Sequence, residues 1–232
     1  MARPSRKARA ARRGRGRPCD PSLHARRRAE ILDTASPCFA RQGYPRTDVQ
    51  HVADALGVGK GTVYRYFPTK RTLFLGCVDR HSQRLLAEMG AIASATGRGP
   101  LEQIGDAFRA YLAYFDRHRE YAELLVQERA EFKDRNRPTY RRVLEAGLRP
   151  WRRFYRALMA KGVIRRMPVD RITDTTSSLL YGTVLTNIYT GRAKCFAVLT
   201  SDLLDVVFRG ILSDAVRHRR SAGGGRGKGG AR

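Results

Sequence analysis

The chain has 232 residues, of which 46 are basic and 21 acidic, and its formal net charge of +25 indicates a polyanionic partner. Charge alone does not separate DNA from RNA or from a membrane surface. Hydrophobic residues make up 42% of the sequence, which is enough for a core, but no apolar run reaches the roughly 18 residues that a membrane-spanning helix needs.

Much of the positive charge lies at the two ends of the chain. Residues 1–28 contain eleven basic residues and one acidic residue, whereas residues 217–232 contain six basic residues and no acidic one. We expect a disordered basic arm over residues 1–21 and a flexible Gly/Arg tail over residues 217–232. The basic N-terminus lacks the apolar stretch of a signal peptide, so we expect a cytoplasmic protein.

The sequence contains no pattern typical of a catalytic or metal site. The cysteines are isolated and the histidines are scattered, without the spacing of zinc ligands, so we expect reduced thiols and no metal. The segment Gly57–Thr62 is superficially similar to a phosphate-binding loop, but Asp54 occupies the first glycine position and no strand precedes it. We therefore expect neither an enzyme nor a bound cofactor.

The first helix is expected over residues 22–42. Apolar residues recur there at steps of three and four, as on the buried face of a helix, and Gly43 follows as a typical stop. Pro37 interrupts this pattern because it lacks the N–H that would bond to the carbonyl of Asp33. We expect it to kink the helix or to divide it in two, at a cost of roughly 3 kcal/mol unless packing compensates.

A capping box is predicted where the next helix begins. The Thr47 hydroxyl can accept a hydrogen bond from the Gln50 amide, and the Gln50 side chain can reach back to the Thr47 amide. This helix is expected over residues 48–56, with Gly57 as its stop.

A second short helix is expected to follow after a tight turn. It begins at residue 59 or 60 and ends at residue 67, because Pro68 breaks it, and Thr69 then caps a fourth helix. Val63 and Phe67 are expected to face the core. Two short helices joined by a tight turn that contains glycine are typical of a helix-turn-helix.

The outward face of this second helix is suited to DNA. The side chains left on the outside are those of Lys60, Thr62, Tyr64, Arg65 and Tyr66. A major groove about 12 Å wide admits one helix, and Arg65 can donate two hydrogen bonds to guanine O6 and N7. Lys60 and Lys70 can supply charge to phosphates, and Lys70 lies near a helix N-terminus that itself attracts phosphate. The alternative for each basic residue is a solvated surface side chain.

A single pattern in helical register covers most of residues 29–74. It consists of Ala29–Ala35, Phe39–Tyr44, Thr47, Val49, Val52, Ala53, Ala55–Val58, Lys60–Phe67, Thr69, Lys70 and Leu73. In this pattern the chain resembles the DNA-binding domain of the tetracycline-repressor (TetR) family. The resemblance implies an all-α protein, with an N-terminal three-helix helix-turn-helix domain over residues 22–75 and a larger helical ligand-binding and dimerisation domain over residues 76–216.

The resemblance also implies roles for individual residues. The recognition helix matches residues 60–67, and Tyr64 and Lys70 match positions that usually contact phosphates. The positions that can reach bases are matched by Thr62, Arg65 and Tyr66. The whole set expected to bind DNA within the domain is Thr47, Lys60, Gly61, Thr62, Tyr64, Arg65, Tyr66 and Lys70.

The chain departs from the family pattern at two positions. Pro37 stands where the family usually has an apolar helix former, and Gly59 stands where a serine often caps the recognition helix. Glycine is only a slightly poorer cap than serine. Neither departure removes a residue expected to contact DNA.

The basic arm contains the segment Gly14–Pro18, which resembles the core of an AT-hook. Narrow A·T-rich minor grooves have a strongly negative potential that attracts arginine, so Arg15 and Arg17 are candidate minor-groove contacts. Glycine lets the backbone lie deep in the groove, and Pro18 keeps it extended. A plain solvated tail, or a wrongly assigned start of the chain, is the alternative.

Five further helices are expected over residues 100–116, 119–133, 138–161, 169–190 and 198–216. The last of them is apolar on more than one face and therefore needs burial on more than one side. One face can pack in its own domain while the other meets a second copy of the chain. The helices over residues 169–190 and 198–216 thus predict a homodimer with a four-helix interface. A monomer with a central helix is the alternative.

A pocket for an unknown small-molecule effector is expected between the helices of this domain. The candidate lining residues are Phe108, Tyr111, Leu125, Glu128, Trp151, Tyr155, Tyr181 and Asn187. Each of them has plain core or surface as its alternative. Glu128 shares a face with apolar residues, and a half-buried carboxylate needs a partner, either a nearby arginine or a cationic ligand.

These observations predict a ligand-responsive, DNA-binding transcriptional regulator, a repressor as most such proteins are, that binds double-stranded DNA at a palindromic or near-palindromic operator as a dimer. A bound ligand is expected to favour a conformation in which the two recognition helices lose the spacing of successive major grooves. The alternative is a sequence-neutral protein that compacts DNA, which the charged tails favour.

Overall fold

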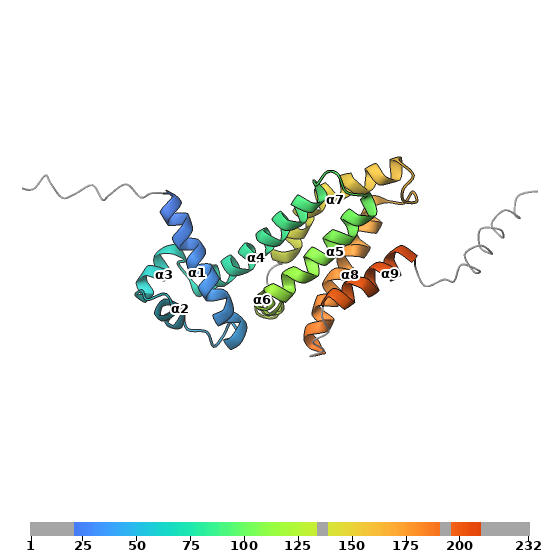
Figure 1. The fold of residues 1–232 in the computed structure, drawn as a ribbon. Coiled ribbons are helices and arrows are strands. Elements are labelled where there is room, and N and C mark those ends of the chain that lie inside the picture. The colour runs from blue at the N-terminus through green and yellow to red at the C-terminus, as the bar shows by residue number, and fades with distance from the viewer. Residues whose placement is uncertain (1–20, 134–138, 191–195, 210–232) are drawn as a thin grey trace, which may run out of the picture. The chain divides into compact units, whose positions relative to one another are not determined.

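The computed structural model describes residues 21–133, 139–190 and 196–209, and every regular element within them is an α-helix (Figure 1). In chain order these are α1 (Pro21–Gln42), α2 (Val49–Ala55), α3 (Lys60–Tyr66), α4 (Lys70–Ala93), α5 (Pro100–Arg117), α6 (Arg119–Glu131), α7 (Thr139–Ala160), α8 (Val169–Tyr189) and α9 (Phe196–Arg209). The all-α prediction is confirmed. The chain divides into two compact units, the first ending at Cys77 and the second beginning at Val78.

Several sequence predictions fall outside the described residues. They concern the basic arm with Arg15 and Arg17, the Gly/Arg tail, the expected helix start at Pro138 and the end of the helix expected over residues 198–216. Among the described helices, none is both long and apolar enough to cross a membrane.

The first unit is built around a core to which each of its helices contributes. The α2 helix buries Val49, Val52 and Ala53, and α3 and its C-cap bury Val63 and Phe67. The inward orientation predicted for Val63 and Phe67 is confirmed, since both side chains are at most 1% exposed. This packing fixes which face of α3 is left for solvent.

The α1 helix runs through Pro37 as one element, so of the two predicted alternatives, a kink or a division in two, the division is excluded. The side chains around the proline take part in the local hydrogen bonding. The Ser36 hydroxyl donates to the Leu32 carbonyl at 2.8 Å, and the Cys77 thiol donates to the same carbonyl at 3.6 Å. Gly43 ends the helix with a φ of 79°, a left-handed conformation that glycine adopts at little cost.

The cap of α2 differs from the predicted capping box. Asp48 is the N-cap, and its carboxylate accepts a hydrogen bond from the Gln50 amide at 2.9 Å. Thr47 is buried, and its hydroxyl donates to the Gly43 carbonyl at 2.7 Å, so it is occupied by the end of α1. The Gln50 side chain donates forward to Asp54 at 2.7 Å instead of reaching back.

The predicted cap of α4 is confirmed. The Thr69 hydroxyl accepts a hydrogen bond from the Thr72 amide at 3.0 Å, and the Thr69 amide donates to the Thr72 hydroxyl at 3.1 Å. This reciprocal pair satisfies backbone donors that an N-terminus would otherwise leave unpaired.

The second unit packs α5 against α6, α8 and α9, and α7 against α8 (Figure 1). Its core is rich in aromatic rings: Tyr114, Phe115 and Tyr121 are each at most 2% exposed, and the last two stack with their centroids 5.1 Å apart. The Tyr121 hydroxyl meets the Ser82 hydroxyl at 2.7 Å, so this polar atom is hydrogen-bonded inside the core.

The first unit has one point of very close helix packing, at Gly76 of α4. A Cβ atom added there would lie 2.9 Å from the Leu32 side chain and 3.0 Å from the Phe67 ring. Both side chains belong to the core, so neither can move away freely. Gly90 lies in the same helix, and a Cβ atom added there would meet nothing within 4 Å.

We expect Gly76→Ala to lower the free energy of unfolding by roughly 1–2 kcal/mol, because overpacking of the core outweighs the helix propensity of alanine. Gly90→Ala is the matched control and should leave the stability unchanged or raise it by up to about 1 kcal/mol. Urea unfolding followed by circular dichroism measures both. Equal stabilisation by the two substitutions would show that the contact at Gly76 is loose.

Candidate nucleic-acid interface and ligand pocket

The inward face of α3 packs on the core of the first unit, and its outward face is exposed to solvent. Val63 and Phe67 hold it to the core, and the Thr62 amide closes its first turn on the Gly59 carbonyl at 2.8 Å. Gly59 is the N-cap and supplies no side-chain bond. The exposed residues are Gly61, Tyr64 and Arg65, whereas Lys60, Thr62 and Tyr66 are half-buried.

The C-terminal end of α3 is held by α1. The Tyr66 ring lies against the His24 ring, with centroids 4.6 Å apart, and the Arg28 guanidinium donates to the Tyr66 carbonyl at 3.2 Å. The same guanidinium lies 4.2 Å from the centroid of the Phe67 ring. A cation at a helix C-terminus interacts favourably with the helix dipole. Sequence analysis did not find Arg28, because its contact joins residues 38 positions apart.

An ion pair connects α3 to the cap of α2. The Lys60 ammonium lies 2.7 Å from the Asp48 carboxylate, and the two side chains are 39% and 53% exposed. The Gln50 amide and then the Lys60 ammonium lower the pKa of Asp48, while the hydrogen bond to Asp48 raises the pKa of Lys60. The lysine expected to meet a phosphate is therefore paired within the protein when no DNA is present.

Lys70 is also engaged by the protein itself. Its ammonium donates to the Pro45 carbonyl at 2.9 Å and to the Thr47 carbonyl at 3.1 Å, and it lies 4.8 Å from the centroid of the Tyr44 ring. An ammonium has three donors, so one donor is left for a phosphate oxygen. Lys70 thus holds the turn between α1 and α2 in place. The buried Thr47 contributes its backbone carbonyl to this arrangement.

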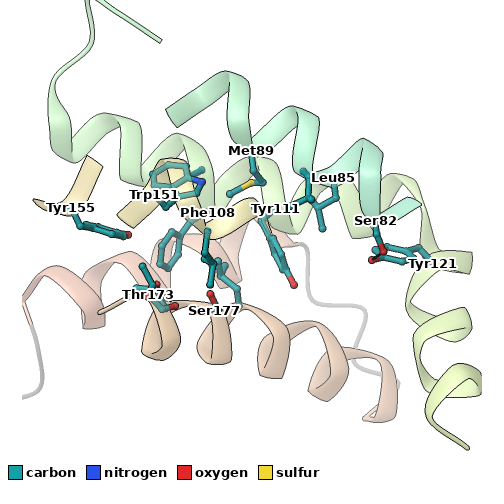
Figure 2. Close-up of a pocket in the computed structure, with 16 residues that line it drawn as sticks. Ser82, Leu85, Met89, Phe108, Tyr111, Tyr121, Trp151, Tyr155, Thr173 and Ser177 are labelled. Carbon is teal, nitrogen blue, oxygen red and sulfur yellow. Dashed lines mark hydrogen bonds between the residues drawn. The ribbon is translucent and has the colours of Figure 1, made fainter. Parts of the chain in front are cut away.

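The second unit contains a partly open, apolar cavity of about 70 Å³ lined mainly by α4, α5, α7 and α8, with Tyr121 of α6 (Figure 2). Four of the eight residues expected to line a pocket line this one: Phe108, Tyr111, Trp151 and Tyr155. The remainder of the wall includes residues that sequence analysis did not select, namely Ser82, Leu85, Leu86, Met89, Thr173, Thr176 and Ser177. For Thr173, Thr176 and Ser177, the small hydroxyl side chains among the apolar residues of α8 were a signal in the sequence.

Two polar atoms at this cavity limit what it can accept. The indole Nε1 of Trp151 is buried and has no hydrogen-bond partner among the described residues. Burial raises the pKa of Tyr155 to about 12, so its hydroxyl stays protonated at neutral pH. A buried donor without a partner is costly, and a ligand that carries an acceptor would satisfy it.

The other four expected pocket residues lie elsewhere. Leu125 and Glu128 are buried in α6 outside the cavity wall, and Tyr181 is half-buried on α8. The Glu128 carboxylate accepts a hydrogen bond from the Thr139 amide at 2.9 Å, which places a negative charge at the N-terminus of α7. Asn187 lines a separate, open groove between α8 and α9.

The arrangement of α2 and α3 defines a helix-turn-helix unit followed by a helical second unit with a cavity. Residues 31–77 match the family described as bacterial regulatory proteins, tetR family. Over these residues the N-terminal unit of the chain is similar to the DNA-binding domain of the TetR family.

One curated relative is the HTH-type transcriptional repressor Rv1474c of Mycobacterium tuberculosis, which is 36% identical over 73 residues. The match covers 32% of this chain and 37% of the relative, and the matched parts of the curated relatives span 28–55% of their lengths.

Two solved structures share the whole fold. The regulator FadR from Bacillus subtilis, in complex with stearoyl-CoA, is 17% identical with a TM-score of 0.66 and covers 79% of this chain and 99% of its own. A regulator from Saccharomonospora viridis, in complex with choline, is 22% identical with a TM-score of 0.65 and covers 82% and 99%. At these identities the likeness establishes the fold.

The ion pair between Asp48 and Lys60 predicts a pH dependence of stability. A carboxyl group whose pKa is lowered by folding contributes stability above its unfolded pKa, about 3.9, and loses it as the pH falls through the folded value. Asparagine caps a helix as well as aspartate, so Asp48→Asn removes the charge and keeps the cap. We expect its urea midpoint to lie below that of the wild type at pH 7 and to converge with it in acid.

The control for this substitution is Asp54→Asn, since Asp54 accepts only the exposed Gln50 side-chain bond among the contacts described above. Its midpoint should follow that of the wild type at both pH values. A gap between Asp48→Asn and the wild type that does not change with pH would mean that the ion pair contributes nothing.

Proposed function

We propose that the protein is a ligand-responsive transcriptional regulator, a repressor, that binds an operator as a homodimer through α3. The single observation that carries this proposal is the orientation of α3, which buries Val63 and Phe67 and leaves Tyr64 and Arg65 exposed. Its N-terminal unit is similar to the DNA-binding domain of the TetR family, and the curated relatives named above are regulators. A sequence-neutral DNA-compacting protein has no support among these comparisons.

On DNA, we assign base contact to Arg65 and backbone contact to Tyr64. Arg65 lies in the last turn of α3, and an exposed guanidinium on a helix that enters the major groove can reach guanine O6 and N7. Gly61 leaves the start of α3 without a side chain, so its backbone can approach the DNA closely. Thr62 and Tyr66 lie at the edges of this face. The Thr47 side chain is buried, so it is removed from the proposed set of contacts.

Phosphate contact by Lys60 and Lys70 requires little rearrangement. Lys60 is bound to an exposed carboxylate, Asp48, and such surface ion pairs contribute little to stability. Lys70 keeps its two carbonyl bonds and uses its third donor. Both ammonium groups therefore start from fixed positions next to the exposed face of α3.

The proposed dimer forms through α8 and α9. Large apolar side chains on these helices are exposed within the single chain, namely Leu179, Tyr189, Val198, Val206 and Phe208. Leu179 lines the open groove between the two helices together with Leu199. An apolar face of this extent is typical of a surface that a partner covers, and the same surface on a second copy can cover it under two-fold symmetry.

The effector is proposed to bind in the cavity between α4, α5, α7 and α8. The walls select an apolar ligand, and Trp151 Nε1 selects one that carries a hydrogen-bond acceptor. A volume of about 70 Å³ is far below the roughly 300 Å³ of a small ligand pocket, so entry requires the surrounding helices to move apart. Leu85, Leu86 and Met89 of α4 form part of this wall, and α4 begins at Lys70 in the first unit. A ligand that displaces α4 thereby biases the DNA-binding unit.

Selection of DNA from a random duplex pool at about 150 mM salt tests the operator proposal, because non-specific phosphate contacts are weakened there. We expect a palindromic or near-palindromic site. Arg65→Ala should relax the preference at one position of each half-site. A bidentate arginine–guanine pair contributes about 1–3 kcal/mol, so the loss of two pairs, one in each half-site, should weaken binding of the dimer by about 30-fold or more.

Arg156→Ala is the charge-matched control, because Arg156 is exposed on α7 in the second unit. It should leave both the selected sequence and the affinity essentially unchanged. Recovery of no sequence by the wild-type protein, or the same sequence with equal affinity by Arg65→Ala, would contradict the assignment.

The dimer proposal predicts that Val206→Asp, which puts a charge on the exposed apolar face of α9, raises the dimer dissociation constant by more than about 100-fold. Analytical ultracentrifugation measures this constant directly. Val163→Asp is the control, because Val163 is also a large exposed apolar residue but lies in the turn between α7 and α8. A monomeric wild-type protein, or a Val206→Asp variant as dimeric as the wild type, would exclude this interface.

A further inference from the structure

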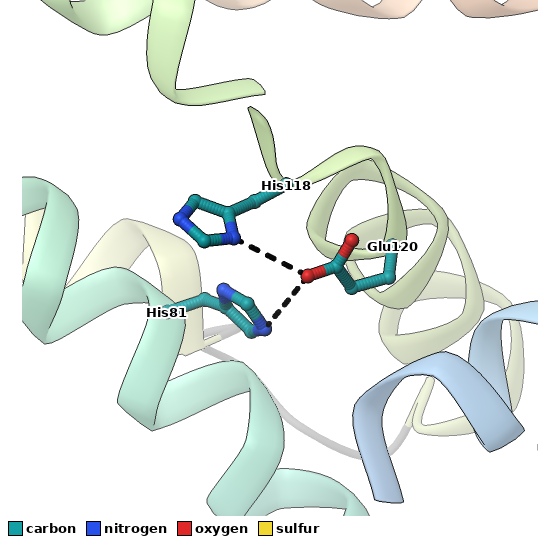
Figure 3. A group of neighbouring side chains, drawn as sticks. All are labelled: His81, His118 and Glu120. Carbon is teal, nitrogen blue, oxygen red and sulfur yellow. Dashed lines mark hydrogen bonds and ion pairs between the residues drawn. The ribbon is translucent and has the colours of Figure 1, made fainter. Parts of the chain in front are cut away.

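Three side chains that can bind a metal converge in the second unit, and none of them lines the cavity (Figure 3). His81 comes from the middle of α4, His118 from the junction of α5 and α6, and Glu120 from the first turn of α6. The carboxylate Oε1 of Glu120 lies 3.8 Å from His81 Nε2 and 3.4 Å from His118 Nδ1. These three atoms all lie within 4.8 Å of one another.

The hydrogen bonds of Tyr114 set the protonation of the His81 ring. The Tyr114 hydroxyl donates its one proton to the His81 carbonyl at 3.0 Å, and its oxygen lies 3.2 Å from His81 Nδ1. Since that proton is used, the hydroxyl oxygen acts as acceptor and Nδ1 carries the hydrogen. In the neutral ring, the lone pair of Nε2 then faces the carboxylate of Glu120. Two acceptors that face each other are stabilised by a cation between them.

The His81 ring is also held rigidly. It stacks on the Tyr121 ring with centroids 5.2 Å apart, and its side chain is only 3% exposed. A metal-binding histidine that donates its other ring nitrogen to a fixed oxygen is the usual arrangement in protein metal sites, because this bond orients the ring. Tyr114 supplies such an oxygen here, and its own side chain is buried.

The cluster is closed on one side and open on the other. The side chains of His118 and Glu120 are 29% and 27% exposed, so an ion can enter from solvent and keep a water as a further ligand. Two imidazoles and one carboxylate match Zn²⁺ and similar divalent transition metals, whereas Mg²⁺ and Ca²⁺ prefer oxygen ligands alone. Ligand atoms bound tetrahedrally at about 2.0–2.1 Å from zinc lie roughly 3.3 Å apart. The separations of 3.4 Å and 3.8 Å from Glu120 Oε1 are near this value, and a bound ion would draw together ligand atoms that now lie within 4.8 Å of one another.

We propose that His81, His118 and Glu120 form a binding site for a divalent transition-metal ion, with Zn²⁺ as the best match. The ion would connect the middle of α4 to the junction of α5 and α6. The site does not depend on the proposed DNA-binding function, since all of its ligands belong to the second unit.

The test uses the full-length, metal-free protein and Co²⁺, whose visible absorption reports coordination, followed by competition with Zn²⁺. We expect one bound ion per chain, an absorption band typical of four or five nitrogen and oxygen ligands, and a rise in melting temperature of roughly 5 °C at saturating Zn²⁺. His118→Ala and Glu120→Gln should each weaken binding by at least 10-fold. Both residues are partly exposed, so these variants keep the core intact.

His51→Ala is the matched control, because His51 is an exposed histidine on α2 in the first unit. It should bind Co²⁺ as the wild type does. Three results would overturn the proposal: no saturable binding to the wild type, unchanged binding by both His118→Ala and Glu120→Gln, or loss of binding in His51→Ala. Any of these would leave the cluster as a histidine–carboxylate pair without a metal.

Discussion

The contact between Phe67, at the C-cap of α3, and Gly76 of α4 is the constraint on which the DNA-binding unit depends. A Cβ atom added at Gly76 would lie 2.9 Å from the Leu32 side chain and 3.0 Å from the Phe67 ring, and the Arg28 guanidinium lies over that ring, 4.2 Å from its centroid. A recognition helix of seven residues has too few hydrogen bonds to be stable alone, so tertiary packing must hold it. Gly76 contributes to this packing by leaving room for the Phe67 ring and the Leu32 side chain.

Because one face of α3 is packed against the core, the residues on its opposite face determine which chemical groups are exposed to solvent. Tyr64 and Arg65 are left exposed, while Lys60 and Lys70 are held nearby by Asp48 and by two backbone carbonyls. Positively charged groups that are already ordered lose little entropy when they meet a phosphate. In the second unit, by contrast, the ligand-free state is not fully satisfied. Trp151 Nε1 has no hydrogen-bond partner among the described residues and the cavity is small, so a ligand with an acceptor can change this state.

Periodicity predicted the helices well, because burial of one face determines both the pattern and the fold. Val63 and Phe67 are inward as expected, yet the cap of α2 was assigned to Thr47 instead of Asp48. That error has a physical cause: the Gly43 carbonyl competes for the Thr47 hydroxyl, and this contact depends on how α1 ends. Half of the expected pocket residues line the cavity, whereas the partners of Glu128 and Arg28 and the cluster at His81 arise from contacts between different helices. Sequence spacing carries no signal for such contacts.

Guanine methylation interference on a selected DNA site tests the central claim most directly, because N7 methylation blocks contacts in the major groove only. If α3 of each subunit reads the major groove, methylation should abolish binding at two symmetric positions one helical turn, about 10 base pairs, or a multiple of it apart. Arg65→Ala should make binding insensitive to one guanine in each half-site. Interference that is absent from the major groove, or that is spread without symmetry along the duplex, would contradict the account.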